Sequence, residues 1–295
     1  MALPQPPLEK RDQQYLQELL AQARQAAPGD WLPLTLGSRP LGLISPDRAE
    51  ALRSWLPLER QERRWRWKAN HLGSQERSDQ LRKAADRLRE AGWITGWRDE
   101  AYASWGTVDV PGEAGLLELF RLERAAFRFF GFRSHAVHIN GLTHDGRVWR
   151  AQRAWTKATD PGMGDNLAAG GLAAGESVWS CAWRELQEEA GLTRDHLVSF
   201  SYVGTVVTER LEREGWHSES LQVFNAVLKP SAEPINCDGE VESFACLTPA
   251  EVIDSMRQQI WTLDAACAMA LAWSAGKGNC APPTFSDDIS LRRHA

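Results

Sequence analysis

Apolar residues at helical spacing dominate the first 130 positions of the chain. Within residues 8–27 they recur every three to four positions, and Pro28-Gly29 then ends the pattern. Comparable patterns predict helices over three further segments, 46–55, 75–91 and 116–130. The N-terminal part is therefore expected to be mainly helical, with some short extended pieces.

Segment 60–68, RQERRWRWK, interleaves cations with tryptophans. Arginine and aromatic side chains together can bind a nucleic acid strand by charge and stacking. Nearby Glu59 and Glu62 dilute that charge, so we favour a solvated helix whose tryptophan side packs inward. No nucleic acid partner is expected.

After Gly131 the pattern favours strands over helices. Alternating residues predict strands over 135–142 and 148–154, joined by a turn at Asp145-Gly146. Further strands are expected at 199–208 and 221–228, with helices over 177–190 and after Thr248-Pro249. We therefore predict an α+β protein with two domains, an accessory domain over 1–130 and a mixed-sheet sandwich over 131–295.

Composition excludes several classes of protein. The chain of 295 residues is 43% hydrophobic and 25% charged, and no run of about 18 apolar residues predicts a membrane span. The five cysteines form no CxxC pair, which argues against a disulfide framework or a zinc site. Residues 1–130 hold 20 basic and 18 acidic side chains, and 131–295 hold 14 and 21, so neither part is strongly basic. The N-terminus lacks an apolar signal core, and we predict a cytoplasmic protein.

Three carboxylates define the most informative segment. Glu185, Glu188 and Glu189 stand at i, i+3 and i+4 of the predicted helix, so they project from one face. Their mutual repulsion destabilises the helix unless a cation compensates. Hard oxygen ligands suit Mg²⁺ or Mn²⁺, which often binds carboxylates together with substrate phosphates. The alternative is a solvated acidic face.

The neighbouring residues decide between these readings. Residues 170–192, GGLAAGESVWSCAWRELQEEAGL, match the Nudix box at every defined position, and the chain resembles a Nudix hydrolase. This resemblance implies a loop–helix–loop in which Arg184 pairs with Glu176, and Gly191 ends the helix. It also implies an α/β/α sandwich over the second domain.

The resemblance further assigns the metal ligands and the reaction. Glu185 and Glu189 are the expected ligands, Glu188 shares the cation or its waters, and the Gly170 carbonyl is a further ligand. Nudix enzymes cleave a diphosphate by water attack at phosphorus, so a small-molecule diphosphate is the expected partner. Glu188, Glu189 and the downstream Glu240 are the candidate catalytic acids, with Glu242 as second choice after Glu240 for the extra base.

Segments 122–132, 135–142 and 153–171 resemble a subgroup of Nudix proteins related to thiamine diphosphate, which carry an extra N-terminal domain. The resemblance implies a hydrolase that converts thiamine diphosphate, or its oxidised or damaged analogues, to the monophosphate. It gives the N-terminal domain a role in substrate specificity or in dimerisation, and a homodimer is compatible with the subgroup.

Four residues are candidates for substrate binding. Lys157 and Arg153 precede the box, where cations would meet a diphosphate. His138 and Asn140 share one side of a predicted strand and could read a pyrimidine edge, although a structural role for the histidine is favoured.

Tryptophan is unusually frequent, with 14 residues against 9 Phe and 3 Tyr. We expect Trp179 and Trp183 to pack the box helix onto a sheet, away from its carboxylates. Trp149 and Trp155 are placed to stack on an aromatic, cationic substrate ring.

Three rival functions remain. An ADP-sugar hydrolase differs only in substrate. A non-catalytic Nudix module that senses a nucleotide would tend to lose box acids, whereas this box keeps them. An isomerase of the same fold would use a cysteine, for which Cys181 and Cys237 are candidates, but its box is degenerate.

Overall fold

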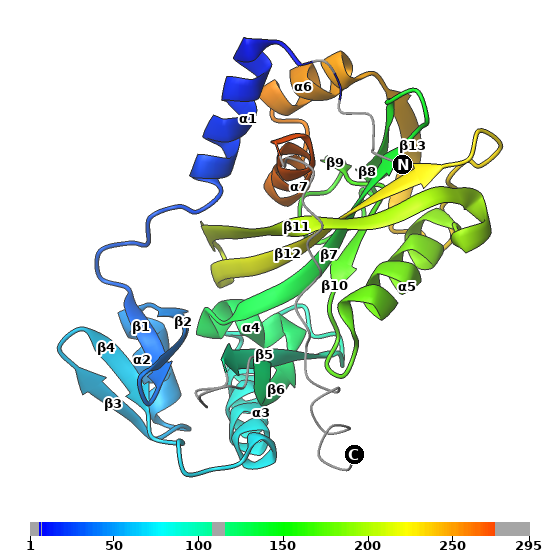
Figure 1. Ribbon diagram of the computed structural model, residues 1–295. Coiled ribbons are helices and arrows are strands. Elements are labelled where there is room, and N and C mark those ends of the chain that lie inside the picture. The colour runs from blue at the N-terminus through cyan, green and yellow to red at the C-terminus, as the bar shows by residue number, and fades with distance from the viewer. Residues whose placement is uncertain (1–5, 7, 108–115, 275–295) are drawn as a thin grey trace, which may run out of the picture.

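A seven-stranded mixed sheet forms the centre of the molecule (Figure 1). The computed structural model describes residue 6 and residues 8–107 and 116–274, so Cys280 lies outside the described part. The sheet has the order β11-β12-β7-β8-β13, with β10 paired to β7 and β9 paired to β8. Its strands are β7 (Arg133–Leu142), β8 (Val148–Arg153), β9 (Gly164–Asp165), β10 (Ala168–Gly171), β11 (Leu197–Glu212), β12 (Gly215–Leu228) and β13 (Val241–Leu247).

Helices cover both faces of this sheet. Val137 and Ile139 of β7 pack under α5 (Val178–Ala190), whereas Ala136 lies in the cluster that contacts α7 (Leu263–Ser274) on the other face. This alternation is the period of two that the strand pattern predicted. Figure 1 shows α6 (Pro249–Arg257) beside α7, above the sheet in that view. The mixed-sheet sandwich predicted for the second part of the chain is confirmed.

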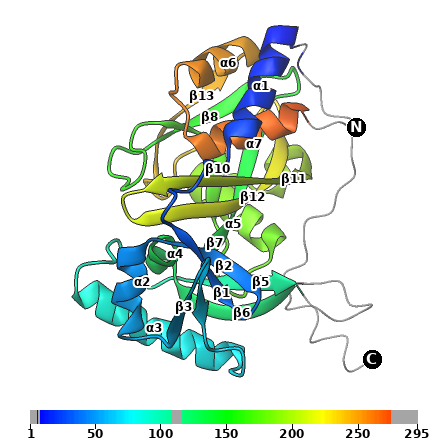
Figure 2. The same cartoon turned by 90° about the vertical axis from the view of Figure 1, so that its left-hand side faces the viewer.

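The first helix, α1 (Lys10–Gln22), packs with this second part (Figures 1 and 2). Leu16 is buried in the same apolar cluster as Val252, Trp261 and Met269. Arg24, just beyond the helix, pairs with Glu209 of β11 at 2.6 Å. The domain boundary at residue 130 stays a prediction. Helix α1 precedes this boundary in the sequence, but it packs against the part of the chain that follows it.

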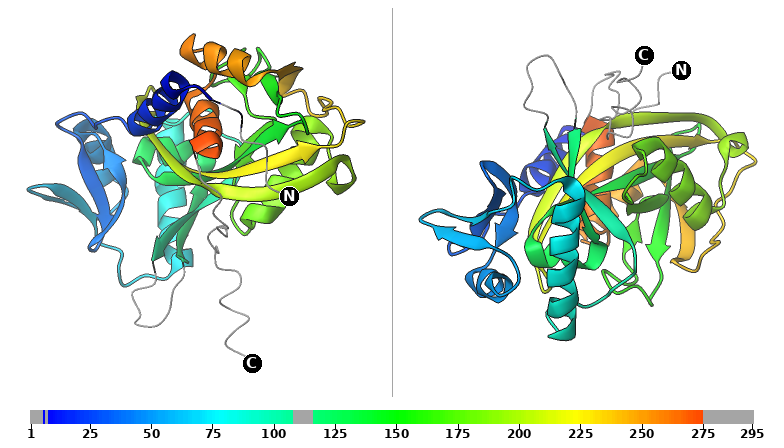
Figure 3. Two further views of the ribbon diagram at one scale, coloured as in Figure 1. Left: turned by 45° about the horizontal axis from the view of Figure 1, so that its top comes forward. Right: turned by 90° about the horizontal axis from the view of Figure 1, so that it is seen from below.

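The rest of the N-terminal part builds a second core on the opposite side of the molecule, as the view from below shows (Figure 3). A four-stranded sheet of order β2-β1-β4-β3 lies beside a separate β5–β6 hairpin. The elements are β1 (Leu32–Leu36), β2 (Arg39–Ile44), α2 (Pro46–Arg53), β3 (Leu58–Gln61), β4 (Arg64–Trp67), α3 (Ser74–Glu90), β5 (Ala101–Thr107), β6 (Leu116–Glu123) and α4 (Arg124–Phe130).

Two helices expected in this part are wrong. Segment 60–68 is the β3–β4 hairpin, in which Trp65 and Trp67 are buried and alternate with the partly exposed Arg64 and Arg66. Segment 116–130 divides into β6 and α4, because β6 pairs with β5 and Glu123 caps the short helix by accepting from the Ala125 amide at 3.2 Å. The α+β class is confirmed, but the N-terminal part contains more strand than predicted.

Gly131 joins the two parts and tolerates no side chain. It ends α4 in the left-handed region at φ 65°, and a Cβ would lie 1.8 Å from the Leu43 carbonyl oxygen of β2. Gly92 after α3 has a similar φ of 79° but open space around it. An alanine at Gly92 would suffer only the strain of the left-handed backbone, whereas an alanine at Gly131 would also clash with β2. Comparing substitutions at the two positions therefore distinguishes the free-energy cost of strain from that of crowding.

Gly131→Ala is therefore expected to lower the free energy of unfolding by about 2 kcal/mol, since overpacking adds to the left-handed strain. Gly92→Ala should cost about 1 kcal/mol, from strain alone. Guanidinium denaturation of both variants measures the difference. Equal destabilisation would show that β2 does not rest against Gly131 in solution.

Candidate active site

The predicted loop–helix–loop of residues 170–192 is present. Ser177 precedes α5, and its hydroxyl accepts from the Ser180 amide at 3.0 Å. The helix ends at Gly191, which has a φ of 64°. The predicted helix end at Gly191 is confirmed, and the two ends together fix which face of α5 turns toward strand β10.

Arg184 holds the loop against the helix, as predicted. Its Nε and Nη2 donate to the two carboxylate oxygens of Glu176 at 2.8 and 2.9 Å. Nη1 reaches Glu185 at 2.6 Å and Glu188 at 3.1 Å, and Nη2 also donates to the Gly171 carbonyl at 3.3 Å. One guanidinium thus neutralises and orients three carboxylates.

Two of the box carboxylates are buried beside β10. Glu185 lies so close to Gly170 that a Cβ on the glycine would be 1.9 Å from its Oε1. Glu189 accepts from the Ala169 amide at 2.8 Å. Burial raises the pKa of Glu185 to about 7 and that of Glu189 well above its usual value. Both carboxyl groups therefore lie where a bound cation would strongly favour the ionised form.

Side chains of Lys157, Asp238 and Glu240 lie close to the carboxylate of Glu189. Lys157 hydrogen-bonds Glu240 and lies 3.9 Å from Glu189 Oε1. Glu189, Asp238 and Glu240 each present an oxygen within 4.8 Å of the others. The sequence identified Glu240 but not Asp238, and Glu242, the second choice, is exposed on β13 and is not among the residues that line the cavity.

A cavity of about 580 Å³ opens over these groups. Glu185, Glu188, Gly170, Lys157 and Glu240 all line it. Glu188 is the most accessible box acid, with 51% of its side chain exposed. These five residues, all candidates from the sequence, therefore lie around one cavity.

The other predicted binding residues divide into two groups. Arg153 lines the cavity, but it is bound to Asp165 at 2.7 Å and to the Thr159 carbonyl, so it shapes the loop around Lys157. His138 also lines the cavity. Asn140 does not line it.

Asn140 is fully buried, and both ends of its amide are hydrogen-bonded. It donates to Asn225 at 3.0 Å and accepts from Asn166 at 2.7 Å. Asn166 in turn contacts His138 Nδ1 at 2.7 Å. Direct substrate contact by Asn140 is thus wrong, because it stands behind the residue that holds His138.

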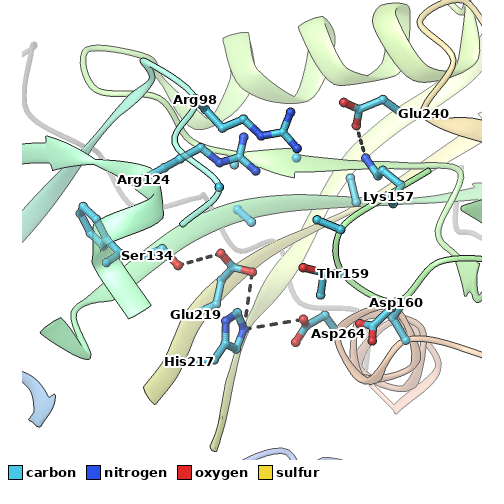
Figure 4. A pocket seen from close by; sticks show the side chains of 18 of the residues that line it. Arg98, Arg124, Ser134, Lys157, Thr159, Asp160, His217, Glu219, Glu240 and Asp264 are labelled. Atoms are coloured by element: carbon cyan, nitrogen blue, oxygen red, sulfur yellow. Dashed lines mark hydrogen bonds and ion pairs between the residues drawn. The ribbon is translucent and has the colours of Figure 1, made fainter. Parts of the chain in front are cut away.

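The N-terminal part forms one wall of the cavity. Arg98, Tyr102 and Arg124 line it together with the box, and the sequence had not singled out Arg98 or Tyr102. Tyr102 packs so tightly on the box that a methyl group at Gly171 would lie 1.6 Å from its hydroxyl, and it bridges to Ala173. Figure 4 shows the Arg98 and Arg124 guanidinium groups extending toward the side on which Lys157 and Glu240 lie.

Comparison with known proteins identifies the second part of the chain. The NUDIX domain model matches residues 133–267, and a domain of unknown function, DUF4743, matches residues 14–134. Residues 133–267 are a Nudix domain. In Arabidopsis thaliana, Nudix hydrolase 24, chloroplastic, is 32% identical over 187 residues, and Nudix hydrolase 20, chloroplastic, is 33% identical over 194 residues.

These matches cover 62% and 64% of this chain and 49% and 50% of the relatives. The chain thus spans about half the length of the curated relatives it matches. Among solved structures, a Deinococcus radiodurans protein has a TM-score of 0.42 at 18% identity over 55% of this chain and 92% of that one. A MutT protein from Methanosarcina mazei has a TM-score of 0.38 at 17% identity, over 47% and 90%.

Cysteine chemistry finds no support in this Nudix domain. Cys181 is buried in α5, where burial and the charges of Glu176 and Glu185 raise the pKa of its thiol. It is not among the residues that line the cavity, and neither is Cys237. The isomerase alternative therefore has no thiol in position.

The tryptophans of the Nudix domain serve the fold. Trp179 and Trp183 pack on Phe200 at 5.8 and 4.4 Å between ring centroids, so their predicted packing on the sheet is confirmed. Trp149 packs against the apolar cluster under α5, and Trp155 is 66% exposed beside Gly162. Neither lines the cavity, so their predicted stacking on substrate is wrong.

Among the described residues, no helix combines the length and apolar character needed to cross a membrane. The two Arabidopsis relatives are named chloroplastic. The cytoplasmic location stays a prediction.

Proposed function

We propose that this protein is a divalent-metal-dependent hydrolase of small organic diphosphates. The observation that carries the proposal is the buried Glu189, which presents an oxygen within 4.8 Å of Asp238 and Glu240. Asp238 and Glu240 line one cavity together with Glu185 and Lys157. Buried carboxylates without compensating charge are costly, and here several share a space large enough for a substrate.

The donor set fits Mg²⁺ or Mn²⁺. All nearby side-chain ligands are carboxylate oxygens, which these hard cations prefer. Glu185 and Glu189 would hold the cation, with Glu188, Glu240, Asp238 and the Gly170 carbonyl in reach of it or of its waters. When bound, it would polarise the phosphorus–oxygen bonds and activate water.

Glu240 is the proposed general base. Burial raises the pKa of its carboxyl, but the hydrogen bond and charge of Lys157 outweigh that effect and lower it, so the group is ionised at neutral pH. With 48% of its side chain exposed, it can accept a proton from water that enters the cavity. Glu188 lines the cavity too, but its carboxylate is held by Arg184.

Lys157 and the N-terminal wall would position the diphosphate. Lys157 supplies a cation beside Glu189, and Arg98 adds a second across the cavity, next to Arg124, whose charge is paired with Glu100 (Figure 4). The reaction forms one bond from water oxygen to phosphorus and breaks the P–O–P bridge, and the departing phosphate takes the bridging electron pair. We propose that residues up to 130 act in substrate specificity through this wall.

Thiamine diphosphate, or an oxidised or damaged analogue, is the proposed substrate, with the monophosphate as product. Support comes from the resemblance of segments 122–132, 135–142 and 153–171 to the thiamine-related subgroup. The cavity has room for a heteroaromatic ring beyond the diphosphate end.

A substrate panel tests this assignment. With Mg²⁺, we expect phosphate release from thiamine diphosphate and oxothiamine diphosphate, with kcat/KM at least about tenfold above that for ADP-ribose. NADH serves as a further dinucleotide control. Turnover of ADP-ribose alone would replace the thiamine assignment with an ADP-sugar hydrolase, and turnover of none would favour a binding module.

A further inference from the structure

A second charged cluster lines the cavity on the side away from Lys157 and Glu240 (Figure 4). His217 and Glu219 come from β12, and Asp264 comes from the first turn of α7. Their ligand atoms all lie within 4.8 Å of one another. Nothing in the hydrolytic mechanism uses them.

Ion pairs satisfy most of the charges around this cluster. Arg210 forks onto the two oxygens of Asp264 at 2.9 and 3.1 Å. Its Nε contacts Glu212 at 2.8 Å, and Arg128 contacts the same carboxylate at 2.6 Å. The positive charges of Arg210 and Arg128 therefore offset the negative charges of Asp264 and Glu212.

Glu219 is the acid of this cluster that neither Arg210 nor Arg128 contacts. The Ser134 hydroxyl donates to its Oε1 at 2.7 Å, and its Oε2 lies 3.9 Å from His217 Nε2, beyond hydrogen-bond distance. Arg124, the cation above it, is paired with Glu100 at 2.6 Å. Among the described residues, the neutral hydroxyl of Ser134 is thus the one group within hydrogen-bond distance of the Glu219 carboxylate on the floor of the cavity.

His217 supplies an independent sign that a ligand belongs here. The ring is 3% exposed, and its Nε2 has no hydrogen-bond partner within the described part of the chain. Burial lowers the pKa of the imidazole, so the ring is neutral near pH 7. Figure 4 shows it between Glu219 and Asp264. A buried polar atom without a partner is costly, and a bound group would satisfy it.

A metal ion fits this cluster poorly. Both oxygens of Asp264 are taken by Arg210, which leaves one carboxylate and one imidazole. Hard cations need more oxygen ligands than that. An amino group or a protonated ring nitrogen needs only one carboxylate and one further polar atom.

We propose that Glu219 and His217 bind an amino group or protonated ring nitrogen on the organic part of the substrate, while its diphosphate lies at the box. This inference rests on the proposed hydrolase function and narrows its substrate to diphosphates of cationic or amino-bearing rings. At the opposite side of the cavity Arg98 is a cation for which the described residues show no ion pair, which suits the phosphate end. The cavity therefore matches a molecule with opposite charges at its two ends.

The test compares two substrates that differ at the organic end. Thiamine diphosphate carries a cationic ring and an amino group, whereas isopentenyl diphosphate carries neither. Glu219→Gln is expected to lower kcat/KM for thiamine diphosphate about 10- to 100-fold more than for isopentenyl diphosphate, mainly through KM. Glu62→Gln, at an exposed acid of the N-terminal part that does not line the cavity, is the matched control and should change neither. Ser134→Ala, which frees Glu219, should give a smaller loss with the same selectivity.

Equal losses for both substrates would assign Glu219 to catalysis or folding and overturn the proposal, as would no loss for either. Loss of one bound Mn²⁺ per chain in Glu219→Gln would assign the cluster to a metal instead. Calorimetric titration of thiamine diphosphate into Glu189→Gln, with and without Glu219→Gln, tests recognition without turnover. If the wild type hydrolyses none of the diphosphates but Glu219→Gln still weakens this binding, the hydrolase assignment fails and the recognition site stands.

Discussion

Glu189→Gln is expected to lower kcat by about 10³-fold with the best diphosphate substrate and Mg²⁺. The carboxylate is buried, lies beside Glu185 and Lys157, and presents an oxygen to the same point as Asp238 and Glu240. An amide keeps the shape and can still accept from the Ala169 amide, but it removes the charge that would hold the cation. Mn²⁺ binding, followed by calorimetry, should weaken about 10- to 100-fold.

The fold of this variant should be intact. Burial raises the pKa of Glu189, so its ionised form destabilises the native state, and a neutral amide removes that penalty. The free energy of unfolding in metal-free buffer is therefore expected to be equal to or above that of the wild type. Glu242→Gln, an exposed acid of β13, serves as the control with normal turnover. A near-normal rate in Glu189→Gln would remove Glu189 from the metal site.

The part of the site that could be predicted is local in sequence. Glu176, Arg184, Glu185 and Glu189 lie within 14 residues on one loop and helix, so helical periodicity and capping fix their mutual positions. The positions of Lys157 and Glu240 in the site could be predicted only from the resemblance to Nudix hydrolases. The two residues are 83 positions apart in the sequence, and the pairing of β8 with β13 brings them together.

The other end of the cavity could not be predicted. Arg98 comes from the loop before β5, and Arg124, Glu219 and Asp264 come from α4, β12 and α7. The packing of β5 and α4 against β7, β12 and α7 brings them together. These residues share no spacing in the sequence that could be recognised as a motif. Trp65 and Trp67 illustrate the limit for the fold, since their alternation fits a hairpin while the charge of the segment suggested a solvated helix.

Arg184 joins the fold of the box to its chemistry, and replacing it should damage both. In Arg184→Ala the half-buried carboxylate of Glu176 and the buried carboxylate of Glu185 lose the cation that contacts them at 2.6 to 2.9 Å. Leaving such carboxylates uncompensated is strongly destabilising, although solvent at the partly exposed Arg184 screens part of the effect. We expect the free energy of unfolding to fall by about 3 kcal/mol and kcat/KM by about 10³-fold.

The effects expected for Arg184→Ala are much larger than those of removing an ordinary surface ion pair. Arg82 pairs with Asp79 on the surface of α3 at 2.8 Å, with both side chains exposed, so Arg82→Ala should cost less than about 0.5 kcal/mol and leave turnover unchanged. Arg184→Lys keeps the positive charge but loses the forked guanidinium. Relative to Arg184→Ala, it should recover part of the free energy of unfolding but little of kcat/KM. A single ammonium group cannot hold Glu176 with two parallel hydrogen bonds while also contacting Glu185. Full activity in Arg184→Lys would mean that charge alone orients the box. Denaturation and kinetics of the three variants decide between orientation by the guanidinium fork and neutralisation by charge.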